Sequence, residues 1–318
     1  MPSNKYDDIQ LNVRDLLDAQ AQRLPTLASR GDSSDDLTFS ASLLSNLELY
    51  WMGFLFRSGL LRRLVYANLS LDWFNEFRQY WVAELGLRPI HLPDFFFLRG
   101  IYRQRFQELE VDEAQGGPAF LAAWQKPANI YLLFSYQYKR ALNPLAGYRV
   151  ARYLKRGARI CEFGCGVAPV ATSLDRFYRN KKWRIDCFDI PSYMLHFARW
   201  KFRDRPYIAV HELDPDNDEQ LTASYDLINC LTVFEHLPRP LATAHHLYAH
   251  LKPGGYLVFN YITSQGDGLD TASALKDRPD VLQFIADHFE VIEGSLPLDG
   301  SSVGTVIAKK RATKLPAK

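Results

Sequence analysis

The residues with the clearest chemical potential lie in one segment, Arg159-Ile-Cys-Glu-Phe-Gly-Cys-Gly-Val-Ala-Pro-Val170. Gly164 and Gly166 allow the backbone to turn tightly and a ligand to approach it closely. Glu162 stands just before this turn, where its carboxylate would repel a phosphate group. A dinucleotide-binding loop would have a third glycine in place of Pro169, and a P-loop would continue with Gly-Lys-Ser/Thr. The segment therefore predicts a site for an adenosine-containing ligand without phosphates, preferably one with positive charge.

Alternating strand and helix patterns surround this loop from residue 157 onward. The β-rich runs cover residues 158–163, 183–190, 207–213, 225–233 and 255–261, and segments of helical periodicity cover 170–178, 192–202 and 241–251. Repeated strand–helix–strand units predict a parallel sheet with helices on both faces, and its ligand crevice lies at the carboxyl ends of the strands. After a further helix at 281–289, the runs 290–296 and 304–310 are joined by a short turn. We therefore expect them to be antiparallel neighbours.

The first half of the chain has a different sequence pattern. Up to about residue 153 its apolar residues recur at helical spacing, as in Leu43, Leu47, Tyr50 and Phe54. We expect an all-α domain over 1–153, an α/β domain over 154–311 and a basic tail over 312–318. Between Tyr50 and Tyr138 there are 21 aromatic residues, well above the chain average of 14%. Most of them are expected to pack a core, and some to line a pocket or lid for a flat or apolar acceptor.

Composition narrows the class of protein. The 318 residues carry a net charge of +2, which gives no field suited to a dedicated nucleic-acid binder. The four cysteines form no metal-binding pattern and are expected to be buried free thiols in a reducing compartment. No secretory signal and no apolar stretch of about 18 residues is present, so we expect a cytoplasmic protein without stable membrane insertion. The segment closest to a membrane-seeking one, 51–69, is interrupted by three arginines and is expected to be a buried amphipathic helix, with peripheral membrane contact as the alternative.

Several ordered segments resemble the class I S-adenosylmethionine-dependent methyltransferases. The glycine loop is similar to their first motif, and the matching later segments are Phe188-Asp-Ile-Pro-Ser-Tyr-Met194, Tyr225-Asp-Leu-Ile-Asn-Cys-Leu-Thr-Val-Phe-Glu-His-Leu-Pro238 and Leu251-Lys-Pro-Gly-Gly-Tyr-Leu-Val258. The resemblance covers about residues 156–311. It implies a Rossmann-like sheet of seven strands, with S-adenosylmethionine as cofactor and S-adenosylhomocysteine as product.

The resemblance also implies roles for single residues. Asp189, at the end of the second strand, corresponds to the acidic residue that binds both ribose hydroxyls, with Asp186 inside the strand as its rival. Asp214 corresponds to the acceptor of the adenine amino group, although Asp216 and Asp218 lie close by in the same acidic loop. The implied cofactor contacts are Glu162, Phe163, Gly164, Gly166, Asp189, Ile190, Leu213, Asp214 and Leu231.

A hydroxyl or ammonium acceptor must lose a proton during methyl transfer, which calls for a base. The loop after the fourth strand faces the methyl group in the resembled fold, so His236, with Glu235 beside it, is the expected catalytic group. The alternative is a structural role, because Glu-His-Leu is frequent in this loop across the family. His211, His245 and His246 are further candidates of lower rank.

Departures from related subfamilies bear on the substrate. Quinone-ring O-methyltransferases carry an extra acidic residue where this chain has Thr232, so no metal is expected here. Enzymes that methylate exocyclic base amines carry Asn/Asp-Pro-Pro-aromatic after the fourth strand, whereas this chain has Asn229-Cys-Leu-Thr232. We therefore expect O- or N-methylation of a small molecule or of a glycan or natural-product precursor. The helical half would act as substrate cap or homodimer interface. The alternative is a non-catalytic scaffold that binds a protein partner through that half.

Overall fold

The computed structural model describes residues 11–28, 39–67, 71–109, 117–217, 220–263, 269–299 and 301–311. Asp218 and the basic tail 312–318 lie outside these ranges. The described part of the first half is helical, as the sequence predicts. Its elements are α1 (Val13–Ala28), α2 (Phe39–Arg57), α3 (Leu60–Tyr66), α4 (Asp72–Gln79), the π-helix η1 (Tyr80–Glu84), α5 (Leu92–Gln107), α6 (Gly117–Gln125), the 3-10 helix η3 (Pro127–Asn129), α7 (Ile130–Leu142) and α8 (Tyr148–Ala151).

The second half alternates strands and helices. The strands are β1 (Arg159–Phe163), β2 (Arg184–Asp189), β3 (Ile208–Glu212), β4 (Tyr225–Cys230), β5 (Leu251–Tyr261), β6 (Phe289–Glu293) and β7 (Val303–Lys310). The helices are α9 (Pro169–Tyr178), η4 (Arg179–Lys181), α10 (Tyr193–Phe202), η5 (Phe234–His236), α11 (Pro240–His250), α12 (Ala272–Lys276) and α13 (Arg278–His288). Each predicted strand is therefore present, with β5 beginning four residues before its predicted start.

The seven strands form one sheet in the order β3-β2-β1-β4-β5-β7-β6. Strands β1 to β5 pair in parallel, whereas β7 runs antiparallel to both β5 and β6. The β6–β7 pairing is the one that the short connection predicts. The order reverses direction between β1 and β4, and ligands bind at such a switch point in open α/β sheets. The glycine loop leaves β1 at this position.

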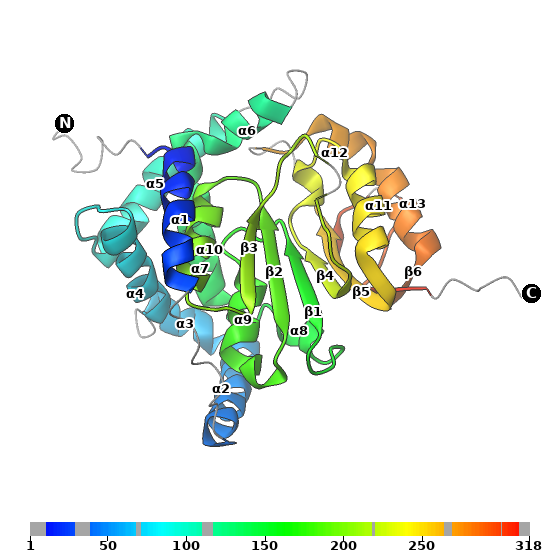
Figure 1. Ribbon diagram of the computed structural model, residues 1–318, viewed down its shortest axis with the longest axis horizontal. Helices are drawn as coiled ribbons and strands as arrows, with labels where there is room; N and C mark the ends of the chain where they lie inside the picture. Colours follow the sequence, from blue (N-terminus) through cyan, green and yellow to red (C-terminus); the bar gives the residue numbers. More distant parts are fainter. Residues whose placement is uncertain are drawn as a thin grey trace, which may run out of the picture.

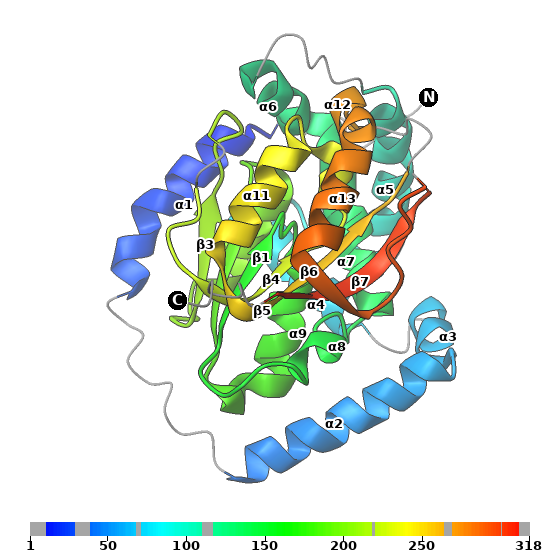
Figure 2. The same cartoon turned by 90° about the vertical axis from the view of Figure 1, so that its right-hand side faces the viewer.

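Two layers of helices cover the sheet. Helices α11 and α13 lie side by side on one face (Figure 2), where Leu247 and Ile285 pack against Ile228 and Phe259. On the other face α9 and α10 pack against the sheet, and the helices of the first half gather around them (Figure 1). The four cysteines are buried free thiols, as predicted.

The helical half shares its core with the α/β half. One hydrophobic cluster runs from Phe77 and Trp81 to Phe197 of α10 and on into the sheet. At this junction the hydroxyl of Tyr80 lies 2.6 Å from Nδ1 of the buried His196, and both residues are almost inaccessible to solvent. The domain boundary near residue 153 stays a prediction, because the packing is continuous across it. In the described residues, no helix has both the length and the hydropathy to cross a membrane.

Candidate cofactor and acceptor site

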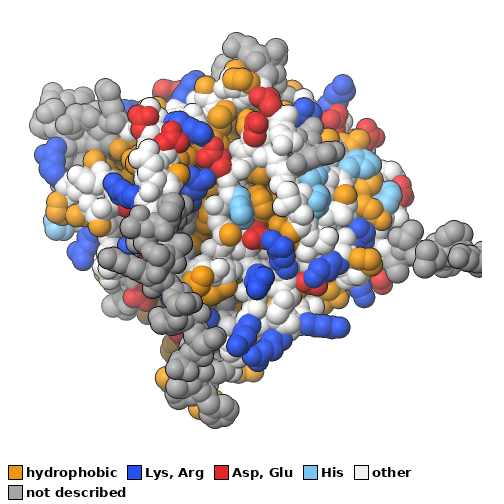
Figure 3. Space-filling model, viewed as in Figure 1, with side chains coloured by type: hydrophobic (Ala, Val, Ile, Leu, Met, Phe, Trp, Pro, Cys, Tyr) orange, Lys and Arg blue, Asp and Glu red, His pale blue; other side chains and the backbone are white. Residues whose placement is uncertain are grey.

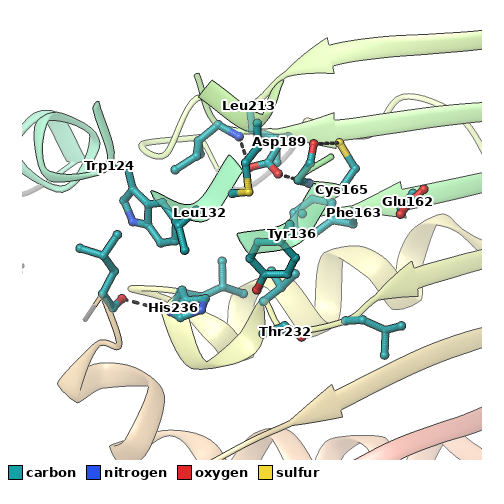
Figure 4. Close-up of a pocket in the computed structure, with 18 of the residues that line it drawn as sticks. Trp124, Leu132, Tyr136, Glu162, Phe163, Cys165, Asp189, Leu213, Thr232 and His236 are labelled. Atoms are coloured by element: carbon teal, nitrogen blue, oxygen red, sulfur yellow. Dashed lines mark hydrogen bonds between the residues drawn. The ribbon is translucent and has the colours of Figure 1, made fainter. Parts of the chain in front are cut away.

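A cavity of about 550 Å³ lies where the glycine loop leaves the sheet. One wall comes from the ends of β1, β2 and β4, and the other from α5, α6 and α7 of the helical half. Figure 4 shows Trp124, Leu132 and Tyr136 on the helical side, with Asp189 and Phe163 among the residues of the α/β side. All nine residues expected to contact the cofactor line this one cavity. Their contact with a cofactor stays a prediction.

The conformation of the glycine loop requires glycine at two of its positions. Gly164 and Gly166 have φ angles of 65° and 54°, in the left-handed region that side chains disfavour. A Cβ atom on Gly164 would lie 2.2 Å from Cγ2 of Val233, so the loop approaches the β4 side too closely for any side chain. The backbone N–H of Cys165 donates to the carbonyl of Phe188 at 2.9 Å and ties the loop to β2.

Glu162 holds the loop to the helix that follows it. Its carboxylate accepts hydrogen bonds from the backbone N–H groups of Val170 at 3.1 Å and Ala171 at 2.7 Å, at the start of α9. These amides lie at the positive end of the helix dipole, so they favour a carboxylate there. Burial acts in the opposite direction and raises the pKa of Glu162 to about 8. Glu162 therefore shapes the loop as well as facing the cavity.

Asp189 connects the second strand to the glycine loop. Its Oδ2 accepts from the backbone N–H of Gly166 at 2.5 Å, and its Oδ1 accepts from the N–H of Ile190 at 2.8 Å. Burial raises its pKa to about 6, against the lowering effect of both amides. The rival carboxylate, Asp186, does not line the cavity and is paired with Arg159 at 2.8 Å. The structure therefore brings Asp189, and not Asp186, to the predicted site.

The third and fourth strands contribute the remaining predicted contacts. Leu213, Asp214 and Leu231 line the cavity, whereas Asp216 does not. The loop around Asp214 is internally bonded, because its backbone N–H donates to Oε1 of Gln220 at 2.5 Å and its Oδ1 accepts from the N–H of Asp216 at 3.0 Å. Asp214 is exposed, in contrast to the buried Glu162.

His236 is the candidate base, and the structure gives it a partner that no sequence motif indicates. Its Nδ1 lies 2.8 Å from Oδ1 of Asp270 and 3.2 Å from the carbonyl of Leu269. Burial alone would lower the pKa of His236, but the hydrogen bond to Asp270 and the charges of Glu235 and Asp270 outweigh it and raise the pKa above its ordinary value. A proton on Nδ1 is thus fixed by Asp270, which leaves Nε2 as the basic nitrogen.

Glu235 and Thr232 lie in the same loop as His236 but have different surroundings. Glu235 is buried and does not line the cavity, so it acts on the cavity through its charge, which raises the pKa of His236. Thr232 lines the cavity at a φ of 58°, and its backbone N–H donates to Oδ1 of Asn260 at 2.5 Å.

In the described part of the chain, no three His, Cys, Asp or Glu side chains group as metal ligands. Of the other histidines considered, only His246 lines the cavity, and its Nε2 accepts from the backbone N–H of Leu221 at 3.0 Å.

Some aromatic residues of the helical half line this cavity, as predicted, but the sequence did not say which, because none of them belongs to a recognised motif. The indole of Trp124 meets the ring of His236 edge-on, with 5.4 Å between ring centroids. Burial, then the carboxylates of Glu235, Asp189 and Asp270, raises the pKa of Tyr136 to about 12, so this phenol stays protonated. The ammonium of Lys139 lies 4.8 Å from the centroid of the Tyr136 ring. Aromatic surface and positive charge thus face the acidic wall of the sheet. The aromatic side chains of this wall are Phe106, Phe120, Trp124, Tyr131 and Tyr136.

The fold and this cavity define an open α/β protein with a nucleoside-type crevice at its switch point. The sequence profile of a family described as "Methyltransferase domain" matches residues 133–292. The chain belongs to this family. Ubiquinone biosynthesis O-methyltransferases are similar in sequence: that of Xanthomonas campestris pv. campestris (strain B100) is 28% identical over 120 residues, and that of Alkalilimnicola ehrlichii 30% over 127, each match covering 37% of this chain and 48% of the relative. The chain thus spans about half the length of the curated relatives it matches.

Solved structures give a weaker likeness. The O-methyltransferase StiE, residues 961–1257, has a TM-score of 0.40 at 13% identity and covers 61% of this chain and 81% of its own. TehB from Haemophilus influenzae has a TM-score of 0.41 at 16% identity, with 57% of this chain and 66% of its own covered.

The family implies S-adenosylmethionine as cofactor, and the cavity fits that molecule. Asn229 lines the cavity, and its Oδ1 is a buried acceptor without a hydrogen-bond partner, which calls for a donor. Asn229 is the β4 residue that pairs with Glu162 of β1. The ammonium of the cofactor would meet this need, while the carboxylates of Asp189 and Asp214 suit its ribose hydroxyls and adenine amino group.

Proposed function

We propose that this protein is an S-adenosylmethionine-dependent methyltransferase that methylates a hydroxyl group on a small planar acceptor. The observation that carries the proposal is the His236–Asp270 pair, whose imidazole lines the same cavity as Glu162 and Asp189. A proton acceptor is needed for a neutral hydroxyl. The curated relatives are named as O-methyltransferases, which supports oxygen over nitrogen.

The bound cofactor supplies an electrophilic methyl group. Asp270 orients the imidazole of His236 so that Nε2 can take the proton of the acceptor hydroxyl. Trp124 packs against that imidazole and, with Tyr136, offers flat surfaces between which a planar acceptor can lie. Closing such a site against water leaves positioning as the main contribution of the helical wall.

Two measurements test this function. Calorimetry should detect S-adenosylhomocysteine binding; no binding at high micromolar ligand would overturn the enzyme and favour a non-catalytic scaffold. Transfer of labelled methyl should then be measured across matched phenols and anilines, and exclusive labelling of the anilines would contradict oxygen methylation.

A variant separates the positioning role of Asp270 from a merely structural one. Asp270→Asn removes the charge that raises the pKa of His236, so the acid limb of the kcat/KM profile should move to lower pH. The affinity for S-adenosylhomocysteine should stay as in the unchanged protein, which shows that the fold is intact. A loss of rate without any movement of the limb would contradict the assignment.

We also propose that a second copy of this chain covers α2. Leu44, Leu47, Trp51 and Phe54, spaced three or four residues apart, are each more than half exposed, although the opposite side of the helix packs on the body through Leu49. Leu43 and Tyr50 widen this stripe. These six side chains expose on the order of 800 Å² per copy, which is the area that one partner buries in a standard interface. Helix α2 lies at the end of the molecule away from α6, which lines the cavity (Figure 1).

Sedimentation equilibrium tests this interface. The unchanged protein should be a dimer, and Leu47→Glu combined with Trp51→Glu should make it a monomer with unchanged cofactor affinity. A monomer in both cases, or a monomer that sediments with anionic vesicles through the same stripe, would overturn the dimer.

A further inference from the structure

The helical wall of the reaction cavity carries positive charge from two helices. Arg103 of α5 and Lys139 of α7 both line the cavity, and both residues are exposed. Arg140 lines it as well, but its guanidinium is paired with Glu76. Among the described residues, neither Arg103 nor Lys139 forms an ion pair. Two cations of this wall therefore remain available to a ligand.

The packing of α5 on α7 brings these two cations to the same part of the wall. Phe106, near the end of α5, meets Tyr131, near the start of α7, with 5.2 Å between ring centroids. Phe96, near the start of α5, meets Tyr138, near the end of α7, at 5.3 Å. The two helices therefore run antiparallel and side by side. Arg103, about one turn before Phe106, is thus level with the middle of α7.

A hydroxyl group lies at the same level. Ser135, in the middle of α7, lines the cavity although it is only 2% exposed. Lys139 follows it by four residues, so the two side chains share one face of the helix. A guanidinium, an ammonium and a hydroxyl can all donate hydrogen bonds, and a carboxylate can accept from each of them. This part of the wall therefore suits an oxyanion.

The carboxylates that line the cavity do not neutralise these cations. In the described part of the chain, His236 is the one side-chain cation that lowers the pKa of Asp189, and none lowers the pKa of Glu162. Asp214 lies in the loop after β3, where its Oδ1 accepts from the N–H of Asp216 at 3.0 Å. Under the proposed function, these carboxylates face a cationic cofactor. The positive charge of the helical wall is then left for the acceptor.

The ring of Tyr136 connects this positive region to the point of reaction. The ammonium of Lys139 lies 4.8 Å from the centroid of the ring. Burial, and after it the charges of Glu235, Asp189 and Asp270, raises the pKa of the same phenol, so the ring also lies close to the loop that holds the base. A planar acceptor on this ring would have one edge at the base and the other at the cations.

We propose that the acceptor carries a carboxylate-type oxyanion on the side of its ring opposite the methylated hydroxyl, bound by Arg103, Ser135 and Lys139. This inference rests on the proposed function, because it describes the second substrate of that reaction. The hydroxyl lies at His236, while the oxyanion accepts hydrogen bonds from the helical wall. Charge at this end orients the acceptor so that the correct oxygen faces the methyl group.

A matched pair of phenols tests the inference. Para-hydroxybenzoate and para-hydroxybenzamide are similar in shape and differ in the charge opposite the hydroxyl. Their affinities are measured by ligand-observed NMR, with and without S-adenosylhomocysteine, and the ratio should favour the benzoate by on the order of 10-fold. The ratio should fall as ionic strength rises, because salt screens exposed charges.

Substitutions of the two cations have matched controls. Arg103→Gln and Lys139→Met should each lower the ratio by about 3- to 5-fold. Arg105→Gln, on α5, and Lys126→Met, just before η3, should leave the ratio unchanged, because neither residue lines the cavity. Equal affinities of the two phenols in the unchanged protein, or the same ratio in all four variants, would overturn the oxyanion site.

Transfer of labelled methyl to both phenols separates this result from the proposed function. Methylation of both without any difference in affinity would remove the oxyanion site and leave the methyltransferase standing. A preference for the benzoate that depends on Arg103 and Lys139, without methylation of either phenol, would support the oxyanion site and contradict hydroxyl methylation.

Discussion

The two walls of the reaction cavity differ in chemistry and in how they are built. The sheet wall is acidic, with Glu162 and Asp189 at the carboxyl ends of β1 and β2 and Asp214 in the loop after β3. The helical wall is aromatic and basic, with Trp124, Tyr136 and Lys139 placed by helix packing. Under the proposed function, the sheet wall would bind the cationic nucleoside and the helical wall would bind the flat acceptor. His236 stands where the two walls meet, in contact with Trp124.

The charged side chains on the surface are also unevenly distributed. The net charge of +2 conceals a gathering of Lys and Arg side chains on the lower part of the face in Figure 3, while Asp and Glu side chains are more frequent on its upper part. The upper end in this view is the end where α6 and α12 lie (Figure 1), and α6 lines the cavity. The acidic groups at this end are consistent with a site for a cationic ligand.

The largest effect is expected where the walls meet. His236→Ala removes the base and should lower kcat by about 10²- to 10⁴-fold, the usual contribution of proton transfer. Calorimetry should show an unchanged affinity for S-adenosylhomocysteine, because the imidazole serves the acceptor. If kcat stayed within a few-fold of the unchanged protein, His236 would be a structural residue of the loop.

The sheet wall is tested by removing its ribose partner. Asp189→Ala should weaken S-adenosylhomocysteine binding by about 1.5–3 kcal/mol, roughly 10- to 150-fold, through the loss of hydrogen bonds to a charged acceptor. Asp186→Ala is the matched control, since its carboxylate pairs with Arg159 outside the cavity and its loss should leave the affinity unchanged. Equal effects of the two substitutions would show that the ribose partner lies elsewhere.

Substitutions in the helical wall should instead weaken acceptor binding and leave cofactor binding unchanged. Trp124→Ala removes a flat surface beside the base and should raise KM for the hydroxyl acceptor by roughly 10-fold, with cofactor affinity preserved. Trp51→Ala, on the exposed face of α2, should leave KM unchanged. A Trp124 variant that lost cofactor and not acceptor would break the division between the walls.

The smallest effect concerns the acidity of the sheet wall. Because burial raises the pKa of Asp189 to about 6 and of Glu162 to about 8, both carboxyl groups lose their protons as pH rises through these values. A sulfonium cation favours the ionised forms, so S-adenosylmethionine affinity should rise several-fold across this window, about a kcal/mol in binding free energy. S-adenosylhomocysteine lacks the sulfonium charge and should respond less in parallel titrations. Identical pH dependence of the two ligands would contradict an electrostatic role for these carboxylates.

The fold of the α/β half could be predicted because its sequence signals are local. A strand and its neighbouring loop are specified by residues a few positions apart, so the glycine loop, the position of Asp189 and the antiparallel β6–β7 pair followed from the sequence. For the helical half the sequence predicted helices and some aromatic pocket lining, but not which residues meet. Its apolar spacing predicts helices but does not say that Tyr80 meets His196 or that one core spans both halves.

The candidate site also has features that the sequence predicts and features that only the structure shows. By itself the sequence determined the sheet, the crevice and the acidic groups that line it, because each depends on backbone turns and strand ends. Only the tertiary structure placed Asp270 against His236, 34 positions away along the chain, and set Trp124 over the same ring. Contacts of this kind depend on packing between distant elements, and no spacing along the chain encodes their geometry.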